Sequence, residues 1–303
     1  MSAERGVPIL ANRRAGARSG AGRVEVLAAA LQQHGFSPQI FGDLAELTAE
    51  TQRLSEAGEL HAVVSAGGDG TISFALNGLP PGTPLAVYPL GTENLLARHM
   101  GITQEPEEFC RMLSAGETTE LDVGRANGRL FLIMAGCGFD AEVVRRFHAA
   151  RSGNIHHLDY IKPIFEAVRN YRYPRLRVYC HEAAAGEFGE PIEARWAFVV
   201  NLPRYALGLG IAPDAAGDDG LLDVITFREG SLWSALWYLG GVLLGQHQQM
   251  SDCTAVRTRQ IRIEAEEPVP YQLDGDPGGF LPLELEVLPH YARLFVPPKT
   301  QDR

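Results

Sequence analysis

The chain has 303 residues, of which 45% are hydrophobic, and its 27 lysines and arginines against 37 acidic residues give a formal net charge of −10. This length allows a sizeable core and favours two domains over one. General nucleic-acid binding needs many cationic contacts to phosphates, so we expect no nucleic-acid partner. The acidic balance also predicts a soluble protein that does not adsorb to anionic membranes by charge alone.

Cysteine usage and the N-terminus predict a cytoplasmic protein. The four cysteines are widely spaced, without a Cys-x-x-Cys pair or zinc-type histidine spacing, which indicates reduced thiols. Met1–Gly6 contains no apolar signal-peptide core. Leu232–Gly245 carries no charge but is too short to span a bilayer, so we expect a buried or partly buried helix and no transmembrane segment.

In chain order, the first part of the sequence alternates strand and helix patterns. The predicted strands are Val7–Ala11, Gln39–Phe41, Leu60–Ala66 and Leu85–Tyr88, and the predicted helices are Arg23–His34, about Ala45–Ala57, Ile72–Asn77 and Pro106–Ala115. This alternation is typical of a parallel sheet covered by helices on both faces.

From about Thr118 the pattern changes to short strands separated by turns. The predicted strands are Glu120–Arg125, Leu130–Ala135, Leu176–Cys180, Trp196–Asn201, Leu222–Phe227, Gln260–Glu264, Leu283–Val287 and Ala292–Val296, with helices near Asp159–Tyr171 and Ser231–Gln246. We therefore expect a mainly antiparallel second domain.

The sequence Gly67-Gly68-Asp69-Gly70-Thr71 lies between a predicted buried strand and a helix. Glycines allow close approach of the backbone to an anion, and the helix that follows offers free N–H groups and a positive dipole end. The Asp69 carboxylate would repel a phosphate. Its presence in this loop is explained if a divalent cation lies between the two negative groups. An ordinary glycine turn, capped by Asp69 or Thr71, is the alternative interpretation.

Two more polar loops follow predicted strands. Pro89–Asn94 precedes the helical run Leu95–Met100, and Asn12–Gly16 follows the first strand. In a parallel sheet all three loops lie at the carboxyl ends of strands, where such folds bind ligands. The chain has no Gly-x-x-x-x-Gly-Lys loop, and its only lysines are Lys162 and Lys299, which argues against a Walker-type NTPase.

At this point the motifs match a family. They are Asn12–Gly16, Gly67–Thr71, Gly91–Arg98, Leu121–Gly124, Gly136–Ala141, Asp218–Asp223 and Asp274–Asp276. In this order they resemble the diacylglycerol kinase catalytic-domain family, which includes bacterial lipid kinases and sphingosine kinases. The resemblance implies an α/β nucleotide-binding domain with a parallel sheet at 1–124 and a mainly antiparallel β-sandwich lipid-substrate domain at 125–303, with an extreme C-terminus that packs back on the first domain.

The resemblance also implies roles for individual residues. The residues implied to contact ATP are Asn12, Gly16, Gly67, Gly68, Asp69, Gly70, Thr71 and Thr92, and Asn94 is a further candidate for polar contacts with the nucleotide. Asp276 matches the acceptor-activating carboxylate, where many relatives have Glu; a carboxylate there accepts the hydroxyl proton as the oxygen attacks the γ-phosphate. Turn chemistry alone also explains Asp274–Asp276, and the two interpretations are compatible.

A structural Mg²⁺ is implied at Asp218-Asp219-Gly220, with the Asp219 side chain and the carbonyls of Ala216 and Leu221 as ligands. Asp122 would belong to the wider metal and hydrogen-bond network. A solvated acidic turn is the alternative. The chain departs from the family at Leu95, where many relatives have Asp, and this removes one acidic group near the phosphates.

The segment Arg145–Arg177 holds eight Arg or Lys against two acidic residues, a local net charge of +6, with aromatic residues between the cations. Such a segment could rest on an anionic membrane; a solvated helix face with its aromatics in the core is the alternative.

Together these patterns predict an ATP- and Mg²⁺-dependent kinase that phosphorylates a hydroxyl of a diacylglycerol-like or sphingoid lipid. The expected partner is a lipid presented at a membrane surface, with peripheral contact at the inner membrane face, and a homodimer stays open. The alternatives are an NAD kinase-like or phosphofructokinase-like phosphotransferase, and a nucleotide- or lipid-binding protein without catalysis. The acceptor is not encoded by the fold or the nucleotide loop.

Overall fold

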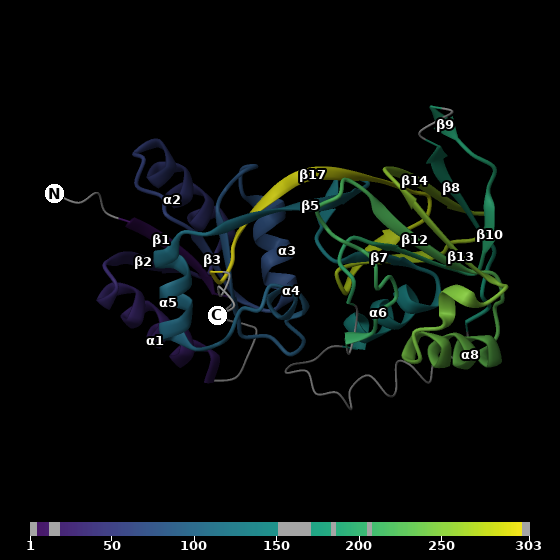
Figure 1. Ribbon diagram of the computed structural model, residues 1–303, viewed down its shortest axis with the longest axis horizontal. Helices are drawn as coiled ribbons and strands as arrows, with labels where there is room; N and C mark the ends of the chain where they lie inside the picture. Colours follow the sequence, from purple (N-terminus) through teal and green to yellow (C-terminus); the bar gives the residue numbers. More distant parts are fainter. Residues whose placement is uncertain (1–4, 12–18, 151–170, 183–185, 205–207, 299–303) are drawn as a thin grey trace, which may run out of the picture. The chain divides into compact units, whose positions relative to one another are not determined.

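A computed structural model describes residues 5–11, 19–150, 171–182, 186–204 and 208–298 (Figure 1). The chain divides into two compact units, Met1–Leu121 with His290–Arg303, and Asp122–Pro289. Strands β5 (Thr118–Ala126) and β17 (Leu283–Phe295) each contribute residues to both units. The domain boundary that the sequence predicts after Gly124 stays a prediction.

A parallel sheet forms the centre of the first unit. Its strands are β1 (Arg5–Ala11), β2 (Phe36–Phe41), β3 (Val63–Gly67) and β4 (Leu85–Pro89). They lie in the order β2-β1-β3-β4, and the end of β17 pairs in parallel with β4 at Leu294 and Leu85. Nearly every residue of β1, β3 and β4 is buried, as parallel strands covered on both faces require. The predicted α/β unit is confirmed.

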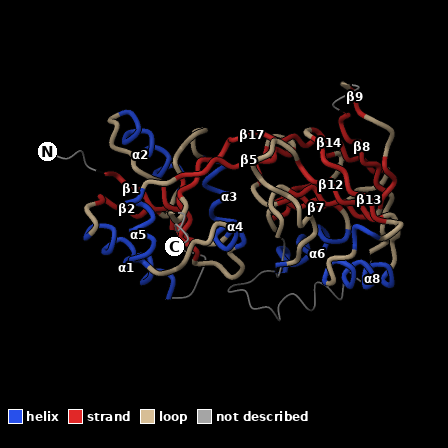
Figure 2. The backbone as a smooth tube through the Cα atoms, in the orientation of Figure 1, coloured by secondary structure: helices blue, strands red, loops and turns tan. Residues whose placement is uncertain are grey.

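Helices connect these strands (Figure 2). They are α1 (Ser19–Gln33), α2 (Leu44–Glu56), α3 (Asp69–Gly78), α4 (Leu95–His99) and α5 (Pro106–Ala115). Right-handed crossovers place α1 on one face of the sheet and α2 and α3 on the other, because the chain reverses direction across the sheet after β2. Consistent with this, α1 packs against α5, and α2 packs against α3.

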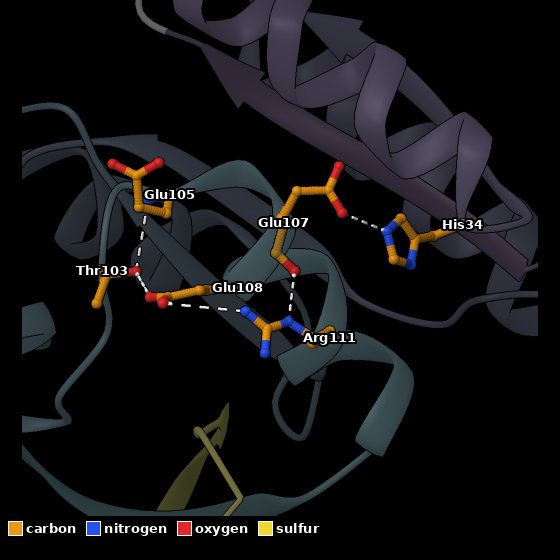
Figure 3. A network of polar contacts seen from close by, with 6 residues as sticks. All are labelled: His34, Thr103, Glu105, Glu107, Glu108 and Arg111. Carbon is orange, nitrogen blue, oxygen red and sulfur yellow. Dashed lines mark hydrogen bonds and ion pairs between the residues drawn. The ribbon is translucent and has the colours of Figure 1, made fainter.

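A polar network fixes α5 beside the end of α1 (Figure 3). His34 Nε2 lies 2.9 Å from a Glu107 carboxylate oxygen, which links the two helices. Thr103 donates its hydroxyl to Glu108 at 2.7 Å, and Arg111 lies 3.9 Å from the same carboxylate. The His34–Glu107 contact helps to hold α5 beside α1, and the other two contacts stabilise the start of α5 itself.

Antiparallel pairing dominates the second unit. One sheet has the order β13-β12-β11-β7-β15-β16, and strands β10, β8, β14 and the first part of β17 pair in a second antiparallel set. Apolar side chains from both sets form one buried core cluster, as in a sandwich. The bounds are β6 (Arg129–Phe131), β7 (Met134–Cys137), β8 (Leu176–Glu182), β9 (Glu187–Phe188), β10 (Ile192–Ala194), β11 (Trp196–Val200), β12 (Leu222–Phe227), β13 (Cys253–Thr258), β14 (Gln260–Ala265), β15 (Pro270–Leu273) and β16 (Asp276–Phe280).

Several elements differ from those the sequence predicts. The expected strands Leu283–Val287 and Ala292–Val296 form one strand, β17, which continues through a left-handed residue, His290, with φ 52°. The expected strand Leu130–Ala135 splits into β6 and β7. Helix α6 (Phe139–Ala150) and strands β13, β15 and β16 were not predicted. Most of the helix expected near Asp159–Tyr171 lies outside the described residues.

The uncharged stretch near the end of the second unit forms α8 (Leu232–Leu243), followed by a 3₁₀ turn at His247–Gln249. Ser231 and Ser234 form a capping box at its start. Within α8 only Tyr238 and Gly241 are buried, so the helix is far more exposed than its composition suggests. In the described part of the chain, no helix combines the length and the apolar character needed to cross a bilayer.

Candidate active site: glycine loops and acidic turns

The first glycine loop joins β3 to α3 in the first unit. Strand β3 ends at Gly67, Gly68 is the N-cap of α3, and Asp69 begins the helix. A Cβ on Gly67 would lie 2.1 Å from the Thr71 hydroxyl oxygen, so the Thr71 side chain covers the Gly67 backbone. Because the first N–H groups of a helix have no partner within it, the start of α3 is suited to hold an anion.

The second loop touches the first, backbone against backbone. Asn94 is buried in a left-handed conformation with φ 50°. Its Oδ1 accepts the Gly91 N–H at 2.9 Å, and its Nδ2 donates to the Gly91 carbonyl at 2.9 Å, which closes the loop on itself. A Cβ on Gly91 would lie 2.5 Å from the Gly68 Cα. Gly91 needs glycine because the two loops approach this closely, and a Cβ on Gly68 would be tight, at 3.2 Å from the Gly91 Cα.

The Asp69 carboxylate joins the two loops. One oxygen accepts the Leu95 N–H at 2.9 Å and the other accepts the Leu96 N–H at 3.1 Å. Asp69 thus supplies a negative charge to the N-terminus of α4, a favourable position for it. Burial raises the pKa of the Asp69 carboxyl, and the hydrogen bonds from these amides oppose that shift. These contacts give the Asp69 carboxylate a structural role in joining the two loops.

The structure brings together several of the residues predicted to hold the nucleotide. Gly67, Gly68, Asp69 and Asn94 form the interlocked part of the two loops, as the contacts above describe. Gly70 and Thr92 are exposed, and Thr71 is half-buried. The two remaining predicted residues, Asn12 and Gly16, lie outside the described residues. Strand β1 ends one residue earlier, at Ala11, which is in register with Ala66 of β3.

In the second unit, Asp274 and Gly275 form the turn of the β15–β16 hairpin. Both have positive φ, 50° and 85°, as a type I′ hairpin turn requires. The Asp274 carboxylate accepts three backbone N–H groups, from Leu132 at 2.8 Å, Ile133 at 2.8 Å and Met134 at 3.0 Å. This carboxylate ties the hairpin to the start of β7, a structural role that the sequence pattern did not reveal.

The predicted catalytic carboxylate, Asp276, lies beside two basic groups. One oxygen is 3.6 Å from an Arg129 guanidinium nitrogen, and the other is 3.6 Å from His148 Nε2. Arg129 also donates to the Pro277 carbonyl at 3.1 Å. Asp276 is partly exposed, so its carboxylate is accessible. Arg129 on β6 and His148 on α6 were not predicted; each is more than 120 residues away in sequence, and no local pattern marks either of them.

A buried glutamine supports this turn. Gln272 Oε1 accepts the Gly275 N–H at 2.8 Å, and Gln272 Nε2 donates to the Asp140 carboxylate at 3.1 Å. A Cβ on Gly136 would lie 2.4 Å from that carboxylate and 2.9 Å from Gln272 Nε2, so glycine is needed there. The hairpin turn is therefore fixed to α6, the helix that carries His148.

Arg257 pairs with the turn that was predicted to bind Mg²⁺. Asp219 Oδ1 accepts the Leu221 N–H at 3.0 Å, and Asp219 Oδ2 pairs with the Arg257 guanidinium. Arg257 Nε lies 3.4 Å from Asp223, whose pKa is raised by burial, an effect that Arg257 opposes. The third predicted ligand, Ala216, is exposed.

The predicted Mg²⁺ at this turn stays a prediction, because the Asp219 side chain pairs with Arg257 here. Both Asp219 oxygens already have partners, and a guanidinium supplies the positive charge that a cation would bring. Within the described ranges, no group of three or more His, Cys, Asp or Glu side chains could hold a metal. The carboxylate of buried Asp122 accepts the Gly220 N–H at 2.6 Å, and this hydrogen bond stabilises the turn.

Comparisons with known proteins match both parts of the chain. Residues 7–126 match the diacylglycerol kinase catalytic domain, and residues 134–296 match the YegS C-terminal NAD kinase beta sandwich-like domain. A diacylglycerol kinase of Mycobacterium tuberculosis is 30% identical over 250 residues, covering 78% of this chain and 77% of that protein. The chain belongs to the diacylglycerol kinase catalytic-domain family. The resemblance predicted from the sequence motifs is confirmed.

Solved structures share the fold of this family member. A diacylglycerol kinase structure from Bacillus anthracis has a TM-score of 0.67 at 21% identity and covers 98% of both chains. An NAD kinase from Archaeoglobus fulgidus, solved in complex with ATP, has a TM-score of 0.54 at 16% identity and covers 97% of this chain and 94% of that chain. At these identities both likenesses concern the fold alone. The predicted fold class, an α/β unit followed by an antiparallel unit, is confirmed.

Proposed function

We propose that this member of a kinase family is an ATP-dependent lipid kinase, which transfers the γ-phosphate to a hydroxyl of a diacylglycerol-like or sphingoid lipid. The observation that carries the proposal is the pair of interlocked glycine loops, in which Asp69 is bound to the N–H groups of α4. That placement leaves the glycine backbone and the start of α3 available for phosphates.

The nucleotide end of the proposal assigns a role to each predicted residue. Gly67, Gly68 and Gly70 let the backbone approach the phosphates, and the Thr71 and Thr92 hydroxyls are donors to phosphate oxygens. Asn94 acts indirectly, because both ends of its amide are bound to Gly91. Strand β1 ends at Ala11, in register with Ala66 of β3, and we assign Asn12 and Gly16, which lie outside the described residues, to the same nucleotide site. Mg²⁺ enters with ATP as part of the substrate and neutralises charge on its phosphates.

At the acceptor end, Asp276 acts as the general base. It takes the proton of the lipid hydroxyl as that oxygen bonds to the γ-phosphorus, while the bond from phosphorus to the bridging oxygen breaks and ADP leaves. Arg129 and His148, each 3.6 Å from Asp276, orient its carboxylate. Asp is one methylene shorter than the Glu of many relatives, so the acceptor must approach the turn more closely.

Two other acceptors or activities compete with this proposal. The likeness in fold to an ATP-bound NAD kinase supports NAD as a second candidate acceptor. Asp276 in place of Glu and Leu95 in place of Asp support a nucleotide- or lipid-binding protein without catalysis. The name of the Mycobacterium tuberculosis relative favours diacylglycerol.

Radiolabelled ATP with Mg²⁺ separates these possibilities when it is offered a panel of acceptors. The panel contains diacylglycerol, monoacylglycerol, phosphatidylglycerol, ceramide, sphingosine and NAD. We expect label in the lipid product of a diacylglycerol-like or sphingoid acceptor. Label in NAD alone would reject the lipid kinase, and bound ATP with no transfer to any acceptor would favour the binding protein.

A further inference from the structure

Helix α8 is anchored to the second unit through its inner face. The Tyr238 ring stacks on Phe227 with ring centroids 4.3 Å apart and contacts Trp196 edge-on. Its hydroxyl accepts the Glu229 N–H at 3.0 Å and donates to the Asp252 carboxylate. A Cβ on Gly241 would lie 2.2 Å from the Met250 methyl carbon, so this side of the helix is closely packed. The opposite side is therefore held in a fixed orientation.

That opposite side is an exposed stripe of apolar residues. The α8 stripe consists of Leu232, Trp233, Leu236, Trp237, Leu239, Leu243 and Leu244. At 100° per residue these positions span about 160° of the helix circumference, an unbroken apolar arc. Trp233 is 79% exposed, Trp237 66%, Leu243 65% and Leu244 73%. Exposed apolar residues scattered singly are normal, but a contiguous set of this size marks an interaction surface.

We infer that the α8 stripe docks the protein onto the surface of a lipid bilayer. This inference deepens the proposed function and rests on it, because a diacylglycerol-like acceptor is held in a membrane rather than dissolved in water. A helix of 12 residues is about 18 Å long, too short for a hydrocarbon core of about 30 Å. The stripe therefore lies in the plane of the interface, with its side chains inserted among headgroups and upper acyl chains.

The chemistry of the stripe favours lipid over a second copy of the chain. Protein interfaces carry about one hydrogen bond per 100–200 Å² and a polar rim. The α8 stripe has no charged side chain, and its only side-chain donors are the two indole N–H groups. Leucine suits hydrocarbon, and tryptophan is enriched where apolar chains meet headgroups. In addition, the net charge of −10 disfavours electrostatic attraction to an anionic membrane, so the docking relies on apolar burial.

Tryptophan fluorescence tests this surface directly. The chain has three tryptophans, and Trp196 is buried, so emission changes on adding vesicles report on Trp233 and Trp237. With neutral phosphatidylcholine vesicles we expect a blue shift and strong quenching by lipids brominated on their acyl chains. We also expect binding that changes less than about twofold between low and physiological salt, because the α8 stripe carries no charged side chain.

Two charge-introducing substitutions at matched exposure provide the mutational test. Leu243→Glu places a carboxylate on the stripe, and Val26→Glu places one on α1, where Val26 is 58% exposed. Leu243→Glu should weaken vesicle binding about tenfold or more, whereas Val26→Glu should bind as the wild type does. Far-UV circular dichroism identifies a variant that fails to fold, and the brominated-lipid quenching of the wild type stands independently of either variant.

Several results would overturn the inference. They are unquenched tryptophan emission in brominated vesicles, binding that requires anionic lipid and disappears with salt, and unchanged vesicle binding by Leu243→Glu. A dimer that Leu243→Glu converts to monomer, with vesicle binding unaltered, would assign the stripe to a second copy. Failure of the proposed function is distinguishable: a folded protein that phosphorylates neither a short-chain diacylglycerol in solution nor sphingosine would reject the lipid kinase, whereas vesicle docking is measured without ATP.

Discussion

At the scale of single residues, Asp69 illustrates how a carboxylate is accommodated in a glycine loop at the start of a helix. Its oxygens accept the first two free N–H groups of α4, so the charge stabilises one helix start while the neighbouring helix start is left for an anion. Asp43 makes a similar pair of bonds, to Ala45 at 2.8 Å and Glu46 at 3.2 Å, but at an exposed helix start remote in sequence from both glycine loops.

Asp69 and Asp43 form a matched pair for mutation. Asp69→Ala should cost about 2–3 kcal/mol of stability, because buried amides lose a charged acceptor, and should weaken ATP binding at least tenfold as the two loops separate. Asp43→Ala should cost about 1 kcal/mol and leave ATP binding unchanged. Thermal unfolding and calorimetric titration with ATP measure both effects. Equal ATP affinity in Asp69→Ala and the wild type would contradict this role for Asp69.

Arg257 accounts for a second single-residue difference from the sequence-based expectation. Because its guanidinium neutralises Asp219 and Asp223, chelating Mg²⁺ should leave the melting temperature of the wild-type protein unchanged. In Arg257→Ala the two carboxylates lose that partner, and Mg²⁺ at ten times its Kd would add about 1.4 kcal/mol. Differential scanning fluorimetry with EDTA and with Mg²⁺ tests both statements. A wild-type melting temperature that falls with EDTA would restore a bound cation to this turn.

At the scale of elements, the β15–β16 hairpin carries two nearby aspartates with different roles. Asp274 stabilises the fold, and Asp276 is the proposed general base. Asp274 accepts three backbone N–H groups, whereas Asp276 is partly exposed and lies 3.6 Å from Arg129 and from His148. Asp274→Ala should therefore lower the free energy of unfolding by about 3 kcal/mol. Asp276→Ala should change it by less than about 1 kcal/mol, the range of exposed ion pairs. Urea unfolding of both variants decides this, and a larger loss in Asp276→Ala would reverse the assignment.

The elements of the first unit could be predicted from sequence because local signals determine them. Pro106 starts α5 at its first position and Gly116 ends it with φ 72°, so both bounds were predicted correctly. In the second unit, where a strand breaks or continues depends on partners that are distant in sequence. The Asp274 carboxylate, about 140 residues away, binds the amides between β6 and β7, and neither residue pattern carries that information.

At the scale of the whole molecule, the glycine loops and the Asp274–Asp276 turn could be found from sequence, because each is a contiguous motif. Arg129, His148 and Arg257 could not, because each is an ordinary basic residue that gains its role only from a carboxylate brought near by folding. The α8 stripe was missed for a different reason: an apolar helix is normally buried, and composition does not say which side faces the core.

Stability should also depend on pH through His61. Its ring lies 4.9 Å from Phe36 and 5.3 Å from Phe295, between centroids, and its Nε2 is 2.9 Å from the Leu113 carbonyl. Burial lowers the pKa of His61, so the folded state binds its proton less readily than the unfolded state. The stability that neutral His61 contributes is fully present above the unfolded pKa of about 6.5. It is lost as pH falls from there towards the folded pKa.

Melting temperatures at pH 7.5 and 5.5 measure this contribution. The wild type should lose more stability between the two pH values than His61→Phe, which cannot take up the proton. If His61→Phe retained the full acid sensitivity, the effect would belong to other groups.

The central claim is phosphoryl transfer from ATP to a lipid hydroxyl with Asp276 as the base. The most direct measurement is the rate of label transfer from γ-labelled ATP to diacylglycerol in mixed vesicles, for the wild type, Asp276→Asn and Asp276→Glu. The account predicts lipid product with the wild type, a loss of about 10²–10⁴-fold in Asp276→Asn, and partial retention in Asp276→Glu. Equal rates in Asp276→Asn and the wild type, or no labelled lipid from a folded, ATP-binding wild type with diacylglycerol or with sphingosine, would contradict it.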